Sequence, residues 1–122
     1  MAKKILLADD SPVIQTLSKK IFNGQGYDFT GLKSGVRVMS EVENNDFDVI
    51  ILDIILPGVG GMDLAKSIRQ LTDKKKAATP IIAISGNYKN YSKSDFDEVG
   101  INEYLIKPLD YDALVKAVKK YA

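Results

Sequence analysis

Three short runs of the chain are continuously apolar, and they constrain the fold most. They are residues 5–8 (Ile-Leu-Leu-Ala), 49–52 (Val-Ile-Ile-Leu) and 81–84 (Ile-Ile-Ala-Ile). Each has the length of a strand and none alternates apolar with polar residues, which is typical of parallel strands covered on both faces. Two weaker candidates, 27–30 and 104–106, suit the edges of a sheet. The pattern therefore predicts a parallel sheet of five strands.

Helical patterns lie between these runs, so that the order is strand–helix repeated five times. Right-handed crossovers place such helices on both faces of the sheet. We expect an α/β fold, the flavodoxin-like (βα)5 doubly wound sandwich with strand order 2-1-3-4-5, as one domain over residues 1–122. The signals are caps and apolar stripes: Ser11 with Ile14, Leu17 and Ile21; Ser34 with Val38 and Val42; Leu64, Ile68 and Leu71; Ser92 with Asp95; and Asp110 with Leu114, Val118 and Tyr121.

Composition removes several classes of function. The chain has no cysteine and no histidine, which excludes disulfides, zinc sites of the Cys/His type and a histidine base. Any metal must therefore have oxygen ligands, which favours magnesium, calcium or manganese. The net charge of +1 gives no general attraction to nucleic acid, and the run Lys74–Lys76 is expected to be a solvated loop. No apolar run approaches the roughly 18 residues of a membrane span, and no signal peptide is evident, so we expect a cytoplasmic protein.

The residues that end the predicted strands are polar and chemically unusual as a set. The first strand ends in Asp9 and Asp10, the third in Asp53, the fourth in Ser85 and the fifth in Lys107. In open parallel sheets, ligand sites form beyond the carboxyl ends of the strands, where the strand order reverses. That point lies between the first and third strands, so the three acids should meet in one crevice flanked by the serine and the lysine.

The charges of this crevice indicate what it binds. Two carboxylates about 4 Å apart repel by roughly 1 kcal/mol in water and by about 4 kcal/mol at an effective dielectric constant near 20. One lysine cannot neutralise three acids, whereas a divalent cation can, and magnesium suits the site best, with manganese possible. Bound magnesium attracts a phosphoryl group, whose oxygens Lys107 and Ser85 would contact. Asp53 can then act as the nucleophile and become an aspartyl-phosphate.

This constellation resembles the receiver domain of two-component response regulators, the CheY-like family, over essentially the whole chain. The resemblance lies in Asp9-Asp10, in Asp53 within Leu-Asp-Ile-Ile-Leu-Pro-Gly, in Ser85-Gly86 and in Lys107-Pro108. It implies that Asp53 accepts phosphate from a histidine on a kinase or a phosphotransfer protein.

The resemblance also implies roles for the neighbouring residues. Asp10 and Asp53 would bind magnesium directly, Asp9 largely through water, and Ile55 through its backbone carbonyl. Ser85 and Tyr104 would form the switch pair, in which the hydroxyl moves toward the phosphoryl group and the ring turns inward. The change would be read on the face of the fourth helix, fifth strand and fifth helix.

The resemblance also implies a backbone feature and a pair of residues that affect dephosphorylation. The Lys107–Pro108 bond should be cis, a form found in only about 5% of X-Pro bonds. Ile55 and Asn87 should flank the path of the attacking water, so that exchanging them alters autodephosphorylation.

The expected function is a stand-alone response regulator, a phosphoacceptor switch rather than an enzyme. Its partners would be a histidine kinase or phosphotransfer protein and a downstream target protein, with no nucleic acid and no membrane insertion. It would be a monomer, or a dimer when phosphorylated.

Three alternative functions fit the sequence less well. A magnesium-dependent phosphohydrolase would need a cap and a general acid, whereas Ile55 is aliphatic. An unphosphorylated docking module does not need the intact acids. A flavin or nucleotide binder would find Asp9 and Asp10 repelling its phosphate, and Gly58–Gly61 lacks a third glycine at the fingerprint spacing.

Overall fold

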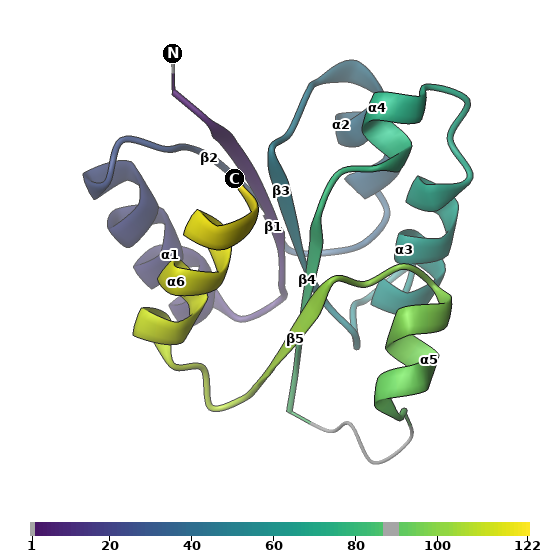
Figure 1. Cartoon of the computed structure of the whole chain (residues 1–122). Coiled ribbons are helices and arrows are strands. Elements are labelled where there is room, and N and C mark those ends of the chain that lie inside the picture. Colours follow the sequence, from purple (N-terminus) through teal and green to yellow (C-terminus); the bar gives the residue numbers. More distant parts are fainter. Residues whose placement is uncertain (1, 87–90) are drawn as a thin grey trace.

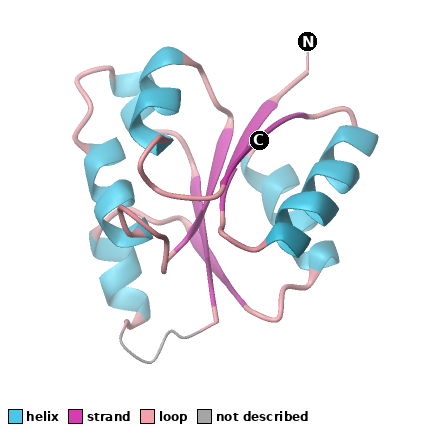
Figure 2. Ribbon diagram, turned by 180° about the vertical axis from the view of Figure 1, so that it is seen from behind, coloured by secondary structure: helices cyan, strands magenta, loops and turns pink. Residues whose placement is uncertain are grey.

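The computed structural model describes residues 2–86 and 91–122, so the expectation for Asn87 lies outside the described residues. A parallel sheet has helices on both faces (Figures 1 and 2). Its strands run in the order β2-β1-β3-β4-β5, which confirms the predicted fold. The strands are β1 (Lys4–Ala8), β2 (Asp28–Leu32), β3 (Val49–Asp53), β4 (Ile81–Ser85) and β5 (Glu103–Ile106). The helices are α1 (Pro12–Gly24), α2 (Val38–Asn44), α3 (Gly61–Arg69), α4 (Lys74–Ala77), α5 (Lys93–Glu98) and α6 (Tyr111–Tyr121).

The central strands are buried on both faces, which explains their unbroken apolar character. All residues of β3 and β4 are buried. Successive side chains point to opposite faces. Leu6, Ile50 and Ile81 pack with helices α2, α3 and α5, and Ile5 and Ile51 pack with α1 and α6. In Figure 1, α1 and α6 lie on one side of the sheet, and α2, α3 and α5 lie on the other. None of the helices in the described part of the chain is both long and apolar enough to span a membrane.

The first helix begins as predicted but turns a different face to the core. Ser11 caps it by accepting from the Ile14 N–H at 3.3 Å. The expectation that Leu17 lies on the buried face is wrong, because Leu17 is 39% exposed while Ser18 and Phe22 are fully buried. The large ring of Phe22 orients the helix, since an aromatic side chain buries more apolar area than a leucine.

The second helix starts later than predicted, and Ser34 does not cap it. The helix begins at Val38, and the Ser34 hydroxyl instead accepts from the Val36 N–H. The Gly35 N–H donates to the Pro57 carbonyl at 2.9 Å, and a Cβ at Gly35 would lie 2.0 Å from a carbonyl oxygen of the same loop. Residues 34–37 are thus held against the loop after β3, which delays the helix.

The lysine run is not a solvated loop. Lys74–Ala77 forms the single-turn helix α4, whose first turn is capped by the Asp73 carboxylate through the Lys75 and Lys76 N–H groups. With this turn, the described part of the chain has six helices where five were predicted. It lies after α3, which ends at Arg69 rather than continuing to Leu71.

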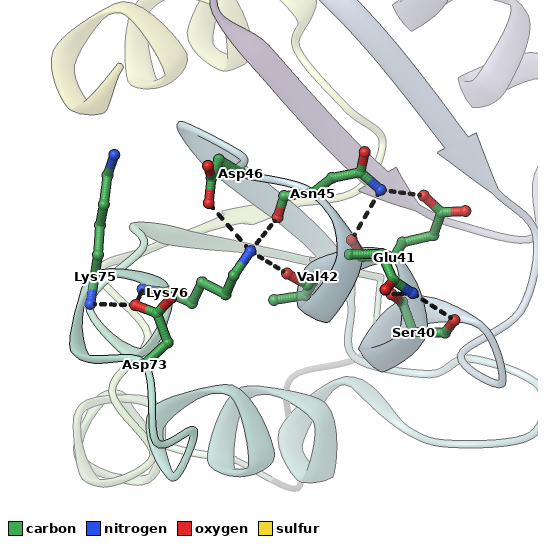
Figure 3. A network of polar contacts seen from close by, with 9 residues as sticks. Ser40, Glu41, Val42, Asn45, Asp46, Asp73, Lys75 and Lys76 are labelled. Carbon is green, nitrogen blue, oxygen red and sulfur yellow. Dashed lines mark hydrogen bonds and ion pairs between the residues drawn. The ribbon is translucent and has the colours of Figure 1, made fainter.

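The side chain of Lys76 binds the end of another helix. Its Nζ donates to the carbonyls of Val42 at 2.9 Å and Asn45 at 2.7 Å, and pairs with Asp46 at 3.1 Å (Figure 3). A cation at the last carbonyls of a helix satisfies acceptors that lack an intrahelical donor. Lys76 therefore fastens the end of α2 to α4.

Replacing Lys76 with methionine should lower the free energy of unfolding by about 2 kcal/mol, because carbonyls lose a charged donor. Lys75→Met, the same change at an exposed neighbour, should cost less than about 0.5 kcal/mol. Urea denaturation of both variants measures the difference. Equal losses would show that the carbonyl contacts contribute nothing.

Candidate functional site

Three carboxylates gather where β1 and β3 end. Asp9 follows β1, Asp53 is the last residue of β3, and the two strands pair up to Ala8 and Leu52. Each of Asp9, Asp10 and Asp53 offers an oxygen, and these oxygens all lie within 4.8 Å of one another. Asp9 is completely buried and Asp53 is 4% exposed, whereas Asp10 is exposed. The expected meeting of the acids in one crevice is present in the structure.

Lys107 bridges two of these acids. Its Nζ lies 2.9 Å from Asp53 Oδ2, which it hydrogen-bonds, and 3.0 Å from Asp9 Oδ2. The second contact is an ion pair without hydrogen-bond alignment, so Asp9 Oδ2 has no hydrogen-bond donor within the described ranges. The Lys107 N–H donates to the Ser85 carbonyl at 2.9 Å, which places the lysine at this edge of the sheet. The Lys107–Pro108 peptide bond is cis.

Backbone N–H groups orient the other oxygens of the buried acids. Asp53 Oδ1 accepts from the Ile55 N–H at 3.1 Å, and Asp9 Oδ1 accepts from the Ser11 N–H at 2.8 Å. Each buried carboxylate is therefore held at one oxygen by the chain that follows it and at the other by the lysine.

Burial and charge shift the proton affinities of this network. Burial raises the pKa of Asp53 and the charge of Asp9 adds to the rise, while Lys107 and the Ile55 N–H offset part of it. Burial pushes the pKa of Lys107 down, but the hydrogen bond with Asp53 and the negative charges of Asp53 and Asp9 outweigh this effect, so the pKa lies above its usual value. The lysine therefore stays a cation, and a carboxylate with a raised pKa is a more basic nucleophile.

The two residues of the expected switch pair lie in different surroundings. Ser85 ends β4 and is 5% exposed, at the edge of the sheet that holds the acids. The Tyr104 ring lies 4.9 Å from that of Phe96, on α5, and is 37% exposed. The structure therefore places the serine beside the site and the tyrosine outside it.

Two further residues near the site, Tyr111 and Gln15, are not marked by any sequence pattern. Burial, and then the negative charge of Asp9, raises the pKa of Tyr111, the first residue of α6. The Gln15 amide donates to carbonyls at the ends of β1 and β2. A tyrosine after a helix cap and a glutamine in a helix are both common, so neither has a local sequence signal.

Asp53→Asn should raise the melting temperature in EDTA at neutral pH. A carboxyl whose pKa is raised by folding favours the native state below its unfolded pKa, about 3.9, and that contribution is lost as the pH rises through the folded value. Asparagine keeps the neutral form at every pH, so its advantage should shrink as the pH falls toward about 4. Thermal unfolding at several pH values tests this, and a variant less stable than wild type at pH 7 would contradict it.

Comparison with known proteins identifies the family. The model of the response regulator receiver domain matches residues 5–119. The chain belongs to this family. The receiver is 31% identical to the alkaline phosphatase synthesis transcriptional regulatory protein PhoP of Bacillus subtilis, over 97% of its own length and 49% of the relative's. It spans about half of PhoP, and 17% and 7% of two kinases among its curated relatives.

Solved structures show the same fold. The receiver domain of the sensor histidine kinase PA1611 from Pseudomonas aeruginosa has a TM-score of 0.86 at 27% identity, covering 99% of this chain and 98% of that one. The response regulator TrrA from Thermotoga maritima has a TM-score of 0.83 at 31% identity, covering 98% and 99%. The first has a magnesium ion coordinated in its active-site cleft, and the second is in complex with Mg²⁺ and BeF. Receiver domains are phosphoacceptor switches of two-component signalling, and the acidic site of this one is consistent with magnesium.

Proposed function

We propose that this receiver is switched by phosphorylation of Asp53, with the phosphoryl group supplied by a phosphohistidine on a kinase or phosphotransfer protein. One observation carries the proposal: Asp53 is a buried carboxylate, within 4.8 Å of two other acids and bridged to one of them by Lys107. Three neighbouring acids, two of them buried, do not stabilise the fold, because like charges repel.

The residues present fit magnesium. Their ligands are hard oxygens, and Asp9 Oδ2 is buried without a hydrogen-bond donor in the described part of the chain. Asp9, Asp10 and Asp53, with the Ile55 carbonyl, would hold Mg²⁺, and Mn²⁺ could replace it. When bound, the cation would neutralise the carboxylates and attract phosphoryl oxygens. The magnesium in the PA1611 and TrrA structures supports this assignment.

The transfer itself would use the chain's own groups. An Asp53 oxygen attacks phosphorus, a phosphorus–oxygen bond forms, and the bond to the donor's imidazole nitrogen breaks with its electron pair. Lys107 would turn from the carboxylates to a phosphoryl oxygen, and the Ser85 hydroxyl would hydrogen-bond another. Tyr104 would follow the serine inward, so that a downstream protein could read the change on α5, β5 and α6.

We also propose that residues 1–122 form one receiver domain, which acts in the cytoplasm as a phosphoacceptor switch and not as an enzyme. It would be a monomer that can dimerise when phosphorylated. Ile55 is 63% exposed, which supports its proposed place beside the path of the water that removes the phosphate.

Incubation with acetyl phosphate and Mg²⁺ tests the proposal. Intact-mass measurement should show a labile phosphoryl adduct on wild type and none on Asp53→Asn or in EDTA. Asp63→Asn, at an exposed acid in the first turn of α3, is the matched control and should be phosphorylated like wild type. An adduct that persists in Asp53→Asn, or no adduct on wild type, would overturn the proposal.

A further inference from the structure

The amide of Gln15 reaches from α1 to backbone carbonyls at the carboxyl ends of β1 and β2. Its Nε2 has two N–H groups and donates to the carbonyls of Leu32 at 2.9 Å and Asp9 at 3.0 Å, with the Leu7 carbonyl sharing one of them at 3.3 Å. One side chain thus ties the carboxyl ends of β1 and β2 to helix α1, which follows Asp10.

These carbonyls lie where the β1–β2 ladder ends. Ala8 is paired with Leu32, and the Asp9 N–H donates to the Leu32 carbonyl at 3.0 Å. A buried or half-buried carbonyl needs a donor, and Gln15 supplies one to Asp9. Since the Ser11 N–H holds the carboxylate of the same aspartate, Asp9 is fixed through both its main chain and its side chain.

Gly31 leaves the space that the amide occupies. A Cβ built on Gly31 would lie 2.1 Å from Gln15 Oε1 and 3.1 Å from the ring of Phe29. The contact with Oε1 is too short to exist, so the amide would have to move. The contact of Gln15 with the strand ends therefore depends on a glycine at position 31.

We infer that Gln15 is a positioning residue for the metal site: its amide, in the space left by Gly31, fixes the backbone of Asp9 and so aims the adjacent Asp10 toward Asp53. The inference rests on the proposed function, in which these acids hold Mg²⁺. Three neighbouring carboxylates repel one another, so a loosely held Asp9–Asp10 segment would move outward. Magnesium requires near-octahedral ligands and is sensitive to such a shift, whereas calcium accepts irregular ones.

Gln15→Met tests the inference, because methionine keeps the length of the side chain and removes its donors. Calorimetric titrations with Mg²⁺ and with Ca²⁺, at a temperature where both proteins are folded, should show Mg²⁺ affinity about 10-fold weaker in the variant. Ca²⁺ affinity should fall less, so that the ratio of the two affinities changes. A lower melting temperature with both affinities unchanged, or an equal loss for both cations, would overturn the inference, since either would indicate a structural role alone.

Gly31→Ala provides a second route to the same effect. It should weaken Mg²⁺ binding by displacing the amide, and the double variant with Gln15→Met should bind no more weakly than Gln15→Met alone. Gly24→Ala is the matched control, because a Cβ at Gly24 meets nothing within 4 Å. Additive losses in the double variant would overturn the inference.

Failure of the inference and failure of the proposed function give different results. A wild-type protein that binds no Mg²⁺ overturns the proposed function and this inference with it. A wild-type protein that binds Mg²⁺, with variants that bind it equally well, overturns the inference alone.

Discussion

Lys107→Met should lower the free energy of unfolding in EDTA by about 3 kcal/mol and at the same time make the protein respond more strongly to Mg²⁺. Removing one partner of a buried ion pair leaves the other charge uncompensated. Here the loss is shared by Asp9, which is fully buried, and by Asp53, which is nearly so. A divalent cation can compensate both acids, and the variant has no lysine competing for them.

Thermal unfolding of wild type and variant, each in EDTA and in excess Mg²⁺, measures both effects. Lys107→Arg keeps the charge and should lose much less stability in EDTA. Lys120→Met removes an exposed lysine that pairs with Glu103 at 3.4 Å, and should change stability by less than about 1 kcal/mol. If Lys107→Met were as stable as Lys120→Met in EDTA, the contacts of Lys107 with the two acids would contribute nothing to stability.

Arg69→Met should lower the free energy of unfolding by about 3–5 kcal/mol, because it removes hydrogen bonds that lie far from the acids. The guanidinium donates twice to the Gly100 carbonyl, at 2.7 and 3.0 Å, and once each to Ala77 and Thr79 carbonyls and to Asn102 Oδ1. These acceptors lie at the ends of α4 and α5 and before β4 and β5. Each acceptor left buried without a donor costs about 1–3 kcal/mol.

Urea denaturation should show this loss as a lower midpoint with an unchanged slope. Arg37→Met is the matched control, since the Arg37 side chain is 73% exposed and pairs with Glu41 one helical turn away. It should lower the free energy of unfolding by less than about 0.5 kcal/mol. The loss for Arg69→Lys should lie between these two values, because lysine keeps the charge but not the planar set of donors. Similar losses for Arg69→Met and Arg37→Met would contradict the assignment.

The features that could be predicted from the sequence are those with a local signal. Unbroken apolar runs identify the buried strands, and the parallel order brings their polar end residues together, as with Asp9 and Asp53. The cap at Ser11 and the capping box of Ser92 and Asp95 are similarly local, and the structure has them.

The features that could not be predicted depend on partners distant in sequence. Lys76 binds the Val42 carbonyl across 34 positions, and Arg69 binds Gly100 across 31. Backbone carbonyls occur at every residue, so no residue type marks them as partners. Ser34 has a residue type that suits a cap, but a glycine contact with another loop overrides that preference.

The partners of Arg69 also determine how the protein responds to salt. Among residues 2–86 and 91–122, Arg69 has no acidic partner and binds only neutral oxygens. Added salt weakens interactions between exposed charges, whereas partly buried contacts are screened much less. Rising ionic strength should therefore weaken the exposed ion pair of Lys120 and Glu103. The hydrogen bonds from Arg69 to the loop carbonyls should change much less.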